Sequence, residues 1–590
     1  MKPPNIRLRI LAVIVLTLLS TSGSAQQRPG IDGRFEDWEA VTVNFADKSG
    51  DGGSTGIDFR SLKISNDEDF LYLSLDVGNE IGLQEKNGVK LYIDTDANPA
   101  TGTRFHGVGA ELIWSFGERK GTIWNGTGPV AIKPAAFGLV TAPTVSSDRF
   151  EMALSRNAII GVITVFPETR IRLLFAEAGG DQLPDGDAFA EYTFSASPFP
   201  PVPTRSISKP DSAALRILTW NVLFNGPFDA AREPSFRRIL KALKPDILCF
   251  QEMFDAQPEQ VRSYIESILP LTDGRQWHAS KTDTGNVLVS SWPIEYARQV
   301  QPVYRESAHL VQPGAPWTTP LLLINNHLRC CTANAERQAE VDGLIAFIRD
   351  ARAGAGPLSL VTGTPILLAG DFNFVGHKQQ LTSLLTGDII DNGLYGPDSS
   401  PDWNGGPLLD LSSRRLNSLF TWTWGDRTSA YAAGKLDYVL YTPSVLRIVS
   451  DMVFDTRDMS VDARTQAGLL AGDSETASDH CPTVVDCLPG NVNSVTESAE
   501  GQGPLQLGLS PNPAADQSEL HYFATTAGRA SITITDAIGR RIMTAERDVD
   551  APGMQRHPLS LRGLPPGSYF LQVAIGGLVK TVRFQKATER

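Results

Sequence analysis

An acid and an amide follow a short apolar run in the second half of the chain. Residues 365–370 read Pro-Ile-Leu-Leu-Ala-Gly and lead into Asp371, Phe372 and Asn373; an apolar run bounded by Pro and Gly is typical of a buried strand. Because side chains alternate along a strand, Asp371 and Asn373 point to the same side. Such a pair can accept a proton from a water molecule and hold that water in place. An aspartate that only begins a turn is the alternative.

Other apolar runs in the same region also carry polar residues at one end, either the last or the first. These ends are Asn221, Gln251-Glu252, His327, Asp437 and Asp479-His480. Each has a structural explanation when taken alone, although a glutamate that closes a buried strand needs a partner for its charge. If the ends converge, they bring together a base, an imidazole and the oxygen ligands that a hard cation prefers. Phosphoester hydrolysis can use these groups, because negative charge accumulates on the phosphoryl oxygens.

The elements that must position these residues lie between residues 211 and 487. Strand-like runs alternate there with helical runs, which predicts a layered α/β domain. The strand-like runs are 215–220, 247–250, 287–290 and 321–325, and the helical runs are 236–243 and 337–349. The polar residues stand at the ends of strand-like runs, so the layers have to bring several strand ends to one place.

Residues 29–195 form a separate all-β pattern. Alternating runs such as 70–77, 89–93 and 171–175 are divided by polar turns, which predicts a β-sandwich. Hard oxygen ligands follow one run at Asp94 and Asp96, so this turn predicts a Ca²⁺ site. A polar turn that satisfies its own backbone is the alternative.

Two resemblances mark the ends of the chain. The opening Ile31-Asp-Gly-Arg-Phe-Glu-Asp-Trp38, with Tyr92-Ile-Asp-Thr-Asp96, resembles the family-9 carbohydrate-binding-like sandwich. This resemblance makes a glycan one expected partner, and a purely structural role of the sandwich is the alternative. Residues 505–590 read as a small β-sandwich and contain Leu509-Ser-Pro-Asn-Pro513, the run Asp536-Ala-Ile-Gly-Arg540 and Leu564-Pro-Pro-Gly567. These motifs resemble the C-terminal sorting domain of type IX secretion, which implies export by that machinery to the cell surface or medium.

The remaining segments are a leader and two linkers. Residues 1–25 combine a basic start, an apolar run of residues 10–19 and small residues before the end, which predicts a secretory signal peptide. That run is too short to span the ~30 Å hydrocarbon layer of a membrane. Residues 196–210 are rich in proline and predict a stiff linker, while the polar residues 488–504 predict a flexible one.

Charge and cysteine content add two further expectations. The chain has 590 residues and a net charge of -13, which disfavours a protein that coats nucleic acid. Among the five cysteines, a bridge from Cys330 or Cys331 to Cys481 or Cys487 is the favoured pairing. Cys481 and Cys487 are not expected to bond to each other, because a strand between them holds them ~20 Å apart.

Taken together and in this order, the polar strand ends resemble the endonuclease/exonuclease/phosphatase superfamily, which includes deoxyribonuclease I-like nucleases and bacterial sphingomyelinases. The run Val287-Leu-Val-Ser-Ser-Trp-Pro293 is similar to another strand of that family. The resemblance implies a four-layer α/β sandwich with two packed sheets. The fold expected for the chain is therefore multidomain, with this α/β sandwich flanked by an N-terminal and a small C-terminal β-sandwich.

The resemblance also implies roles for the polar residues. Glu252 and Asn221 would hold Mg²⁺, with Mn²⁺ as an alternative, and Asp479 would assist or hold a second ion. Asp371 would deprotonate the attacking water, and Asn373 would hold that water or the phosphate. His480 would stabilise the phosphoryl oxygens or donate a proton, with Asp437 fixing its tautomer and orientation, and His327 would contact the phosphate.

Three other residues are candidates for substrate contact. Arg337 begins a helical run, where it is expected either to brace the site or to be a solvated helix start. Trp403 and Arg414 lie in a polar segment, residues 387–415, that is too long for a plain connection; a substrate-facing loop is expected there, and a surface excursion is the alternative. We expect a secreted phosphodiesterase that acts on nucleic acid. A sphingomyelinase-like enzyme or a phosphatase of small esters is the alternative within this class, and an inactive glycan-binding surface protein is the alternative of another class.

Overall fold

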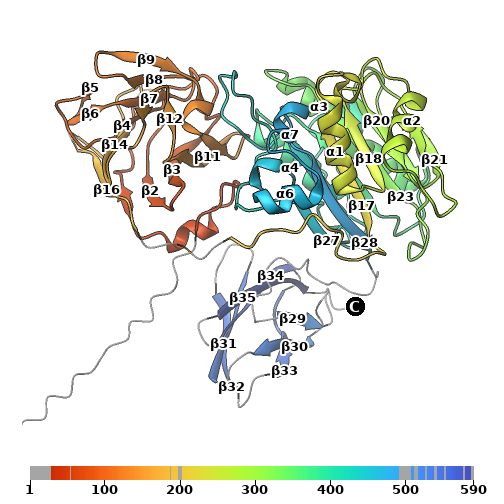
Figure 1. Ribbon diagram of the computed structural model, residues 1–590. Helices are drawn as coiled ribbons and strands as arrows, with labels where there is room; N and C mark the ends of the chain where they lie inside the picture. Colours follow the sequence, from red (N-terminus) through yellow and green to blue (C-terminus); the bar gives the residue numbers. More distant parts are fainter. Residues whose placement is uncertain are drawn as a thin grey trace, which may run out of the picture. The chain divides into compact units, whose positions relative to one another are not determined.

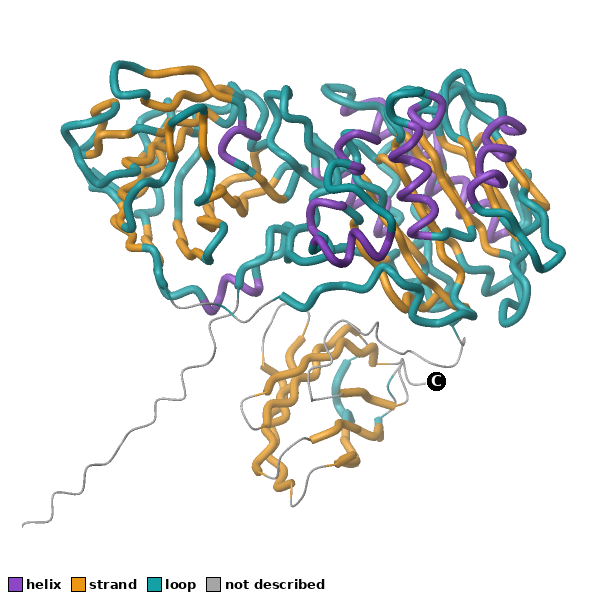
Figure 2. Tube along the Cα trace, viewed as in Figure 1, coloured by secondary structure: helices purple, strands orange, loops and turns teal. Residues whose placement is uncertain are grey.

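The computed structural model describes residues 28–490, apart from 54, 187, 197, 198, 200 and 201, together with the strands and some loop residues between 507 and 586 (Figures 1 and 2). The chain divides into one compact unit up to residue 495 and another from residue 496. The predicted signal peptide, residues 1–25, and most of the predicted linker 488–504 lie outside the described residues. None of the described helices is long and apolar enough to cross a membrane.

The first part of the larger unit is a β-sandwich. One sheet has the order β1-β2-β3-β11-β10, and the other has the order β15-β14-β4-β7-β8-β9 with β16 paired to β14. The strands of the first sheet are β1 Asn44–Ala46, β2 Ser61–Asn66, β3 Phe70–Ile81, β10 Val140–Ala142 and β11 Ser147–Ser155. Those of the second are β4 Lys90–Asp94, β7 Leu112–Ser115, β8 Lys120–Trp124, β9 Pro129–Ile132, β14 Arg170–Ala176, β15 Gln182–Leu183 and β16 Ala190–Thr193. Apolar residues of both sheets share one buried core.

The second part of this unit contains two mixed six-stranded sheets. The first has the order β19-β20-β18-β17-β28-β27, and the second has the order β21-β22-β23-β24-β26-β25. The first comprises β17 Leu215–Asn221, β18 Ile247–Gln251, β19 His278–Ser280, β20 Val287–Ser290, β27 Leu446–Val453 and β28 Thr483–Pro489. The second comprises β21 Ile294–Gln299, β22 Glu306–Val311, β23 Leu321–His327, β24 Ile366–Asp371, β25 Leu409–Asp410 and β26 Asp437–Tyr441.

Three buried clusters arrange these sheets in four layers. The inner faces meet in a cluster that joins Ile217 and Cys249 of one sheet to Leu323 and Val439 of the other. Outside the first sheet lie α1 Glu233–Leu243 and α2 Pro258–Ile268, and outside the second lie α3 Asn334–Ala353 and α4 Lys378–Thr386. Both faces of each sheet are covered, which explains the nearly continuous apolar runs of the central strands. The predicted four-layer fold is confirmed.

The β-sandwich and the α/β part belong to the same unit and share a buried cluster. Ile31, Trp38 and Tyr72 of the sandwich pack with Phe420 of the α/β part, and short parallel bridges join Ile31 to Phe420 and Val140 to Ala433. The connecting segment is also docked, since Arg205 forms an ion pair with Asp451 at 2.8 Å. The proline-rich segment is therefore not a free spacer.

The second unit is a small sandwich of two antiparallel sheets with the orders β29-β30-β33 and β32-β31-β34-β35. Its strands are β29 Leu507–Ser510, β30 Gln517–Ala524, β31 Gly528–Asp536, β32 Arg541–Val549, β33 Gly553–Ser560, β34 Gly567–Ile575 and β35 Leu578–Lys586. Leu520 and Tyr522 of one sheet share a core with Ile532 and Leu571 of the other.

The expected disulfide is not formed. All five cysteines are free: Cys330 and Cys331 are exposed on one loop, whereas Cys481 and Cys487 are buried. Cys481 lies within 3.8 Å of the Arg415 guanidinium, and Cys487 belongs to the cluster between the two sheets. The proposed pairing is wrong because the partners lie in different environments.

Candidate active site

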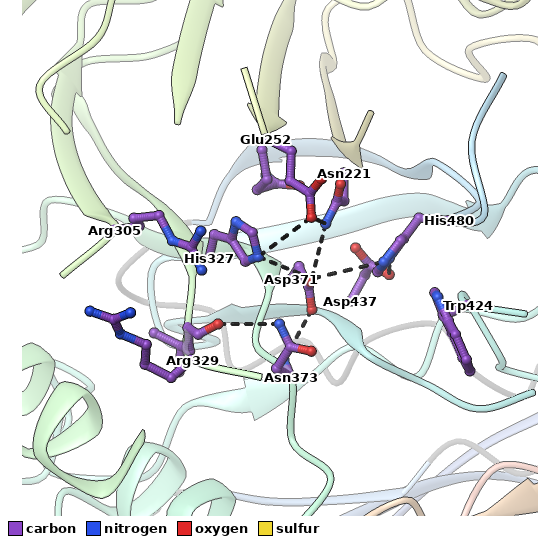
Figure 3. Close-up of polar contacts among 12 residues, drawn as sticks. Asn221, Glu252, Arg305, His327, Arg329, Asp371, Asn373, Trp424, Asp437 and His480 are labelled. Atoms are coloured by element: carbon purple, nitrogen blue, oxygen red, sulfur yellow. Dashed lines mark hydrogen bonds and ion pairs between the residues drawn. The ribbon is translucent and has the colours of Figure 1, made fainter. Parts of the chain in front are cut away.

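The two sheets bring their polar strand ends to one place. In the second sheet, strand register sets His327 beside Asp371 and Asp371 beside Asp437. The ends of β23 and β24 and the start of β26 thus carry polar side chains at one edge. In the first sheet, Asn221 ends β17, Glu252 follows β18 and His480 precedes β28. Figure 3 shows these six side chains facing one another. The site therefore lies across the seam between the sheets.

Asp371 is at the centre of this group. Its Oδ2 accepts a hydrogen bond from Asn221 Nδ2 at 3.1 Å, and the same amide nitrogen donates to Glu252 Oε1 at 3.2 Å. His327 Nε2 and His480 Nε2 lie 3.6 Å and 3.9 Å from Asp371 Oδ2. Asp371 is only 2% exposed, and burial raises the pKa of its carboxyl group to about 7, although the charge of His480 opposes this rise.

The two histidines of the site have opposite properties. His480 Nδ1 lies 2.8 Å from Asp437 Oδ2. Burial alone would lower the pKa of His480, but the carboxylates of Asp437 and Asp371 outweigh it and raise that pKa to about 10. Burial and the nearby cationic Arg305 lower the pKa of His327 well below its usual value. His480 is therefore an imidazolium at neutral pH, and His327 is a neutral imidazole.

Several turns hold the site residues in place. Glu252 and Asn373 adopt left-handed backbone conformations, with φ of 63° and 49°, which cost energy in residues other than glycine and are often found at functional sites. The Asn373 N–H donates to Asp371 Oδ1 at 3.0 Å, and Asn373 Nδ2 donates to the carbonyl of Leu328 at 3.2 Å. The backbone of Asn373 thus fixes the carboxylate that it follows.

Asp479 is held at the rim of the site. Its Oδ2 accepts a hydrogen bond from Trp424 Nε1 at 2.9 Å, and its Oδ1 accepts one from Ser478 Oγ at 3.4 Å. The Ser478 hydroxyl also lies 2.7 Å from the carbonyl of Asn221 and 3.1 Å from the N–H of His480. Ser478 thus ties the end of β17 to the loop that carries His480.

Sequence reasoning missed several residues around the site. No sequence pattern pointed to Trp424, because it lies in an irregular segment. Ser478 could have been found, because it directly precedes the predicted residues Asp479 and His480. Arg305 and Arg329 lie on the His327 side of the site in Figure 3, and Arg329 is two residues after His327. Their closeness depends on how the strands pair, which spacing along the chain does not reveal.

The three predicted substrate contacts are not brought to this site. Arg337 is fully buried and donates to the carbonyls of Arg329 and Cys331 at 2.7 and 3.0 Å. It therefore braces the loop after β23 rather than meeting a substrate. Trp403 Nε1 donates to the carbonyl of Thr364 at 2.7 Å, which places it at the start of β24, whereas Asp371 ends that strand.

Arg414 does not fit a substrate contact either. It lines a small pocket with Gly30, Asp32 and Arg34 of the N-terminal sandwich. The long segment 387–415 thus covers the opposite end of the second sheet and then runs to the sandwich. The length of this segment indicated that it is more than a connection between two elements. It did not indicate which end of the second sheet the segment covers.

The Asp94–Asp96 turn has a third carboxylate nearby. Ligand oxygens of Asp94, Asp96 and Glu111 lie within 4.8 Å of one another. Asp94 also accepts backbone hydrogen bonds from Asn98 and Gly109 at 2.9 and 3.3 Å, so the turn satisfies much of its own backbone. Burial raises the pKa of Asp94 and that of Glu111. The calcium site stays a prediction, now with Glu111 as an added ligand.

Comparisons with known proteins give two family matches. Residues 218–480 match the model of the Endonuclease/Exonuclease/phosphatase family, and residues 509–586 match that of a secretion system C-terminal sorting domain. The chain is therefore secreted or displayed at the cell surface. No curated protein matches the chain at a significant level.

Solved structures give further likenesses. One is to ANGEL2, a 2′,3′-cyclic phosphatase, at 15% identity and a TM-score of 0.31 over 46% of this chain and 95% of that one. Another is to the AP endonuclease LMAP from Leishmania major, at 14% identity and 0.29 over 49% and 93%. A third is to sphingomyelinase C from Streptomyces griseocarneus, at 16% identity and 0.26 over 46% and 99%.

The calcium prediction can be tested by thermal unfolding of the full chain. Ca²⁺ at a hundred times its dissociation constant should stabilise the fold by about 2.7 kcal/mol, because it binds the folded state alone. We expect the melting temperature to rise with Ca²⁺ in the wild type and in the exposed control Glu118→Gln, but not in Asp94→Asn or Glu111→Gln. No rise in the wild type would leave the turn as a purely structural one.

Proposed function

Because residues 218–480 belong to the endonuclease/exonuclease/phosphatase family, we propose that the protein is a secreted, Mg²⁺-dependent phosphodiesterase that acts on nucleic acid. One observation carries this proposal: a buried carboxylate, Asp371, lies 3.9 Å from an imidazolium and shares an amide donor with a second carboxylate, Glu252. These groups match the needs of a reaction in which water attacks phosphorus while negative charge grows on the surrounding oxygens.

Asp371 is the general base of this mechanism. Its pKa of about 7 suits a group that must be ionised at neutral pH and still take a proton from water. The Asn373 N–H donates to Oδ1 of the carboxylate and the Asn221 amide donates to Oδ2, whose second lone pair would accept the proton of the attacking water. The Asn373 side chain lies beside the same carboxylate and would orient the water or a phosphoryl oxygen.

His480 is the positive group opposite this base. Its charge is maintained by Asp437 at 2.8 Å, and a carboxylate on one ring nitrogen fixes the orientation of the other. The free edge of the ring would stabilise the phosphoryl oxygens or give a proton to the leaving oxygen. His327, which is neutral, would contact the phosphate without adding charge.

The ligands present fit a hard divalent cation. Glu252 and Asp371 direct carboxylate oxygens at one Asn221 amide, and two carboxylates in a mostly buried place favour a cation that balances their charge. Glu252 would hold this ion, which we propose to be Mg²⁺, with Mn²⁺ as the alternative. Asn221 would join it through its amide oxygen, which here accepts a hydrogen bond from the Leu223 N–H at 3.0 Å, once the amide turns that oxygen toward the carboxylates. When bound, it supplies charge that polarises the phosphoryl group and stabilises the leaving oxygen. Asp479 is held at the rim by Trp424 and would support the ion from there or hold a second one.

Residues next to Glu252 favour nucleic acid as substrate. Phe224 is 65% exposed, adopts a left-handed conformation with φ of 49°, and its N–H donates to Glu252 Oε2 at 3.0 Å. Its ring lies 5.6 Å from that of Phe254, and the Arg305 guanidinium lies 5.9 Å from the Phe254 ring. The exposed Phe224 ring can stack on a base, while Arg305, on the far side of Phe254, would meet the phosphate backbone.

The other candidate functions have weaker support. Hydrolysis of a phospholipid head group or of a small phosphate ester would use the same central residues, so substrate assays have to separate them. An inactive glycan-binding protein would not need Glu252, Asp371 and His480 together, and the chain retains all three. Glycan binding by the N-terminal sandwich stays a prediction beside the hydrolase function.

The central roles can be tested with the purified full chain and four substrates: plasmid DNA, RNA, sphingomyelin and a small phosphate diester. We expect turnover of nucleic acid with Mg²⁺ and its loss in chelator. Asp371→Ala and His480→Ala should each lower turnover at least ~10²-fold, because each removes a group that acts in the transition state. Asp462→Ala and His278→Ala are controls outside the site. Undiminished turnover in both site variants would exclude the assigned roles.

The role of Asp437 can be tested by the pH dependence of kcat/KM. His480 acts as an acid only when protonated, and the Asp437 carboxylate helps to raise its pKa to about 10. Asp437→Asn removes that charge, so the pKa of His480 should fall and the alkaline limb of the profile should move down by at least about one pH unit. Asp462→Asn should leave the limb in place. An alkaline limb that stays in place in Asp437→Asn would mean that His480 is not the group that titrates there.

The base-stacking role of Phe224 can be tested by comparing two substrates. Stacking of a base on an aromatic ring contributes ~1–3 kcal/mol, so Phe224→Ala should raise KM for an oligonucleotide at least about fivefold. Hydrolysis of a small phosphate diester should change less than about twofold, since it has no base to stack. Val162→Ala, which alters another exposed apolar residue, is the control. A larger loss on sphingomyelin vesicles than on the oligonucleotide would contradict the nucleic-acid proposal.

A further inference from the structure

The N-terminal sandwich contacts the two segments that carry the central carboxylates. One segment, residues 372–377, follows Asp371, and the other, residues 419–436, precedes Asp437. The N–H of Phe372 donates to the carbonyl of Leu436 at 3.0 Å, so the segments also contact each other. Neither is a helix or a strand, and their positions therefore depend on what they pack against.

Thr144 of the sandwich bridges these two segments. Its hydroxyl group lies 2.8 Å from the carbonyl of Phe374 and 3.0 Å from that of Lys435. Phe374 is three residues after Asp371, and Lys435 is two residues before Asp437. The neighbouring Gly434 makes this approach feasible, because a Cβ atom there would lie 2.4 Å from Thr144 Cγ2. A single hydroxyl group of the sandwich thus contacts both the segment that follows Asp371 and the segment that precedes Asp437.

Ser146 and Glu80 extend the contact along the first segment. The Ser146 N–H donates to the carbonyl of Gly376 at 2.7 Å, and Ser146 Oγ accepts from the N–H of Lys378 at 2.9 Å. The Lys378 ammonium forms an ion pair with Glu80 at 2.7 Å. These contacts hold the end of the segment where α4 begins.

The two parts also exchange core residues. Val145 of the sandwich belongs to the buried cluster that contains Phe372, Phe374 and Tyr438 of the α/β part. In return, Ala432 belongs to the core cluster of the sandwich. Val145 lies between Thr144 and Ser146, and Ala432 lies within the segment 419–436. The contact is therefore a packed core rather than a surface encounter between separate domains.

We propose that residues 144–146 of the sandwich are a clamp that positions Asp371 and Asp437, so that the sandwich is part of the catalytic unit. This inference rests on the proposed function and makes Thr144 a positioning residue. Small displacements of positioned catalytic groups lower turnover strongly, whereas substrate affinity depends on other contacts. Loss of the clamp should therefore lower kcat and leave KM nearly unchanged.

Steady-state kinetics of the full chain test this clamp with nearly isosteric variants. Thr144→Val removes the hydroxyl and should lower kcat about tenfold with KM within about twofold of the wild type. Thr144→Ser keeps the hydroxyl and should retain most of kcat. Gly434→Ala, which pushes against Thr144, should resemble Thr144→Val. The control Thr127→Val alters an exposed threonine whose hydroxyl contacts Asn125 alone among the residues described and should match the wild type.

Hydrogen–deuterium exchange separates the clamp from the proposed function. Amides of residues 372–377 and 431–436 should exchange at least about fivefold faster in Thr144→Val than in the wild type or Thr127→Val. Ser146→Ala, which removes the hydroxyl that accepts the Lys378 N–H, should speed exchange in 372–377 even if Thr144→Val does not fold. If the wild type hydrolyses no phosphoester, the proposed function fails, and the exchange rates still show whether residues 144–146 hold the two segments in place. Unchanged exchange and unchanged kcat in the folded variants would overturn the clamp.

Discussion

The buried carboxylate of Asp371 imposes the main constraint on this molecule. A carboxylate removed from water needs hydrogen bonds and positive charge nearby. The chain supplies them from separate elements: an amide from β17, an imidazolium held by Asp437 and the N–H of Asn373. The same charge explains other features of the site. Glu252 and Asn373 adopt left-handed backbone conformations beside it, and Asp479 is held in a fixed position nearby. The same burial that is costly for folding brings the pKa of Asp371 to about 7, where a carboxylate can exchange protons with water.

Much of this arrangement was predictable because local patterns carried it. The apolar runs that end in Asn221, Glu252, His327 and Asp371 are central strands covered on both faces, and such strands have a clear signature in sequence. The four-layer fold followed from their alternation with helices and from a family resemblance. The small C-terminal domain was identified by its motifs, and its family match supports secretion.

Other features depended on tertiary structure that sequence patterns do not encode. Arg337 and Trp403 are the residue types expected at a substrate site, but the first is buried as a brace and the second lies at the far end of β24. Trp424 and Arg305 approach the site through strand pairing and loop packing. The proline-rich segment predicted a spacer, whereas residues on both sides of it pack into a single unit with shared cores. Composition describes the stiffness of a segment but not whether its neighbours have complementary surfaces.

Because the site lies on the seam between the two sheets, its assembly depends on how the sheets dock. Asn221 belongs to one sheet and Asp371 to the other, and a single hydrogen bond of 3.1 Å joins them. A chain in which each sheet has formed but the two have not yet docked contains every necessary side chain and no assembled centre. The packing between the sheets is therefore as necessary to the centre as any one of its side chains, and a loosened seam would remove the site without altering a single site residue.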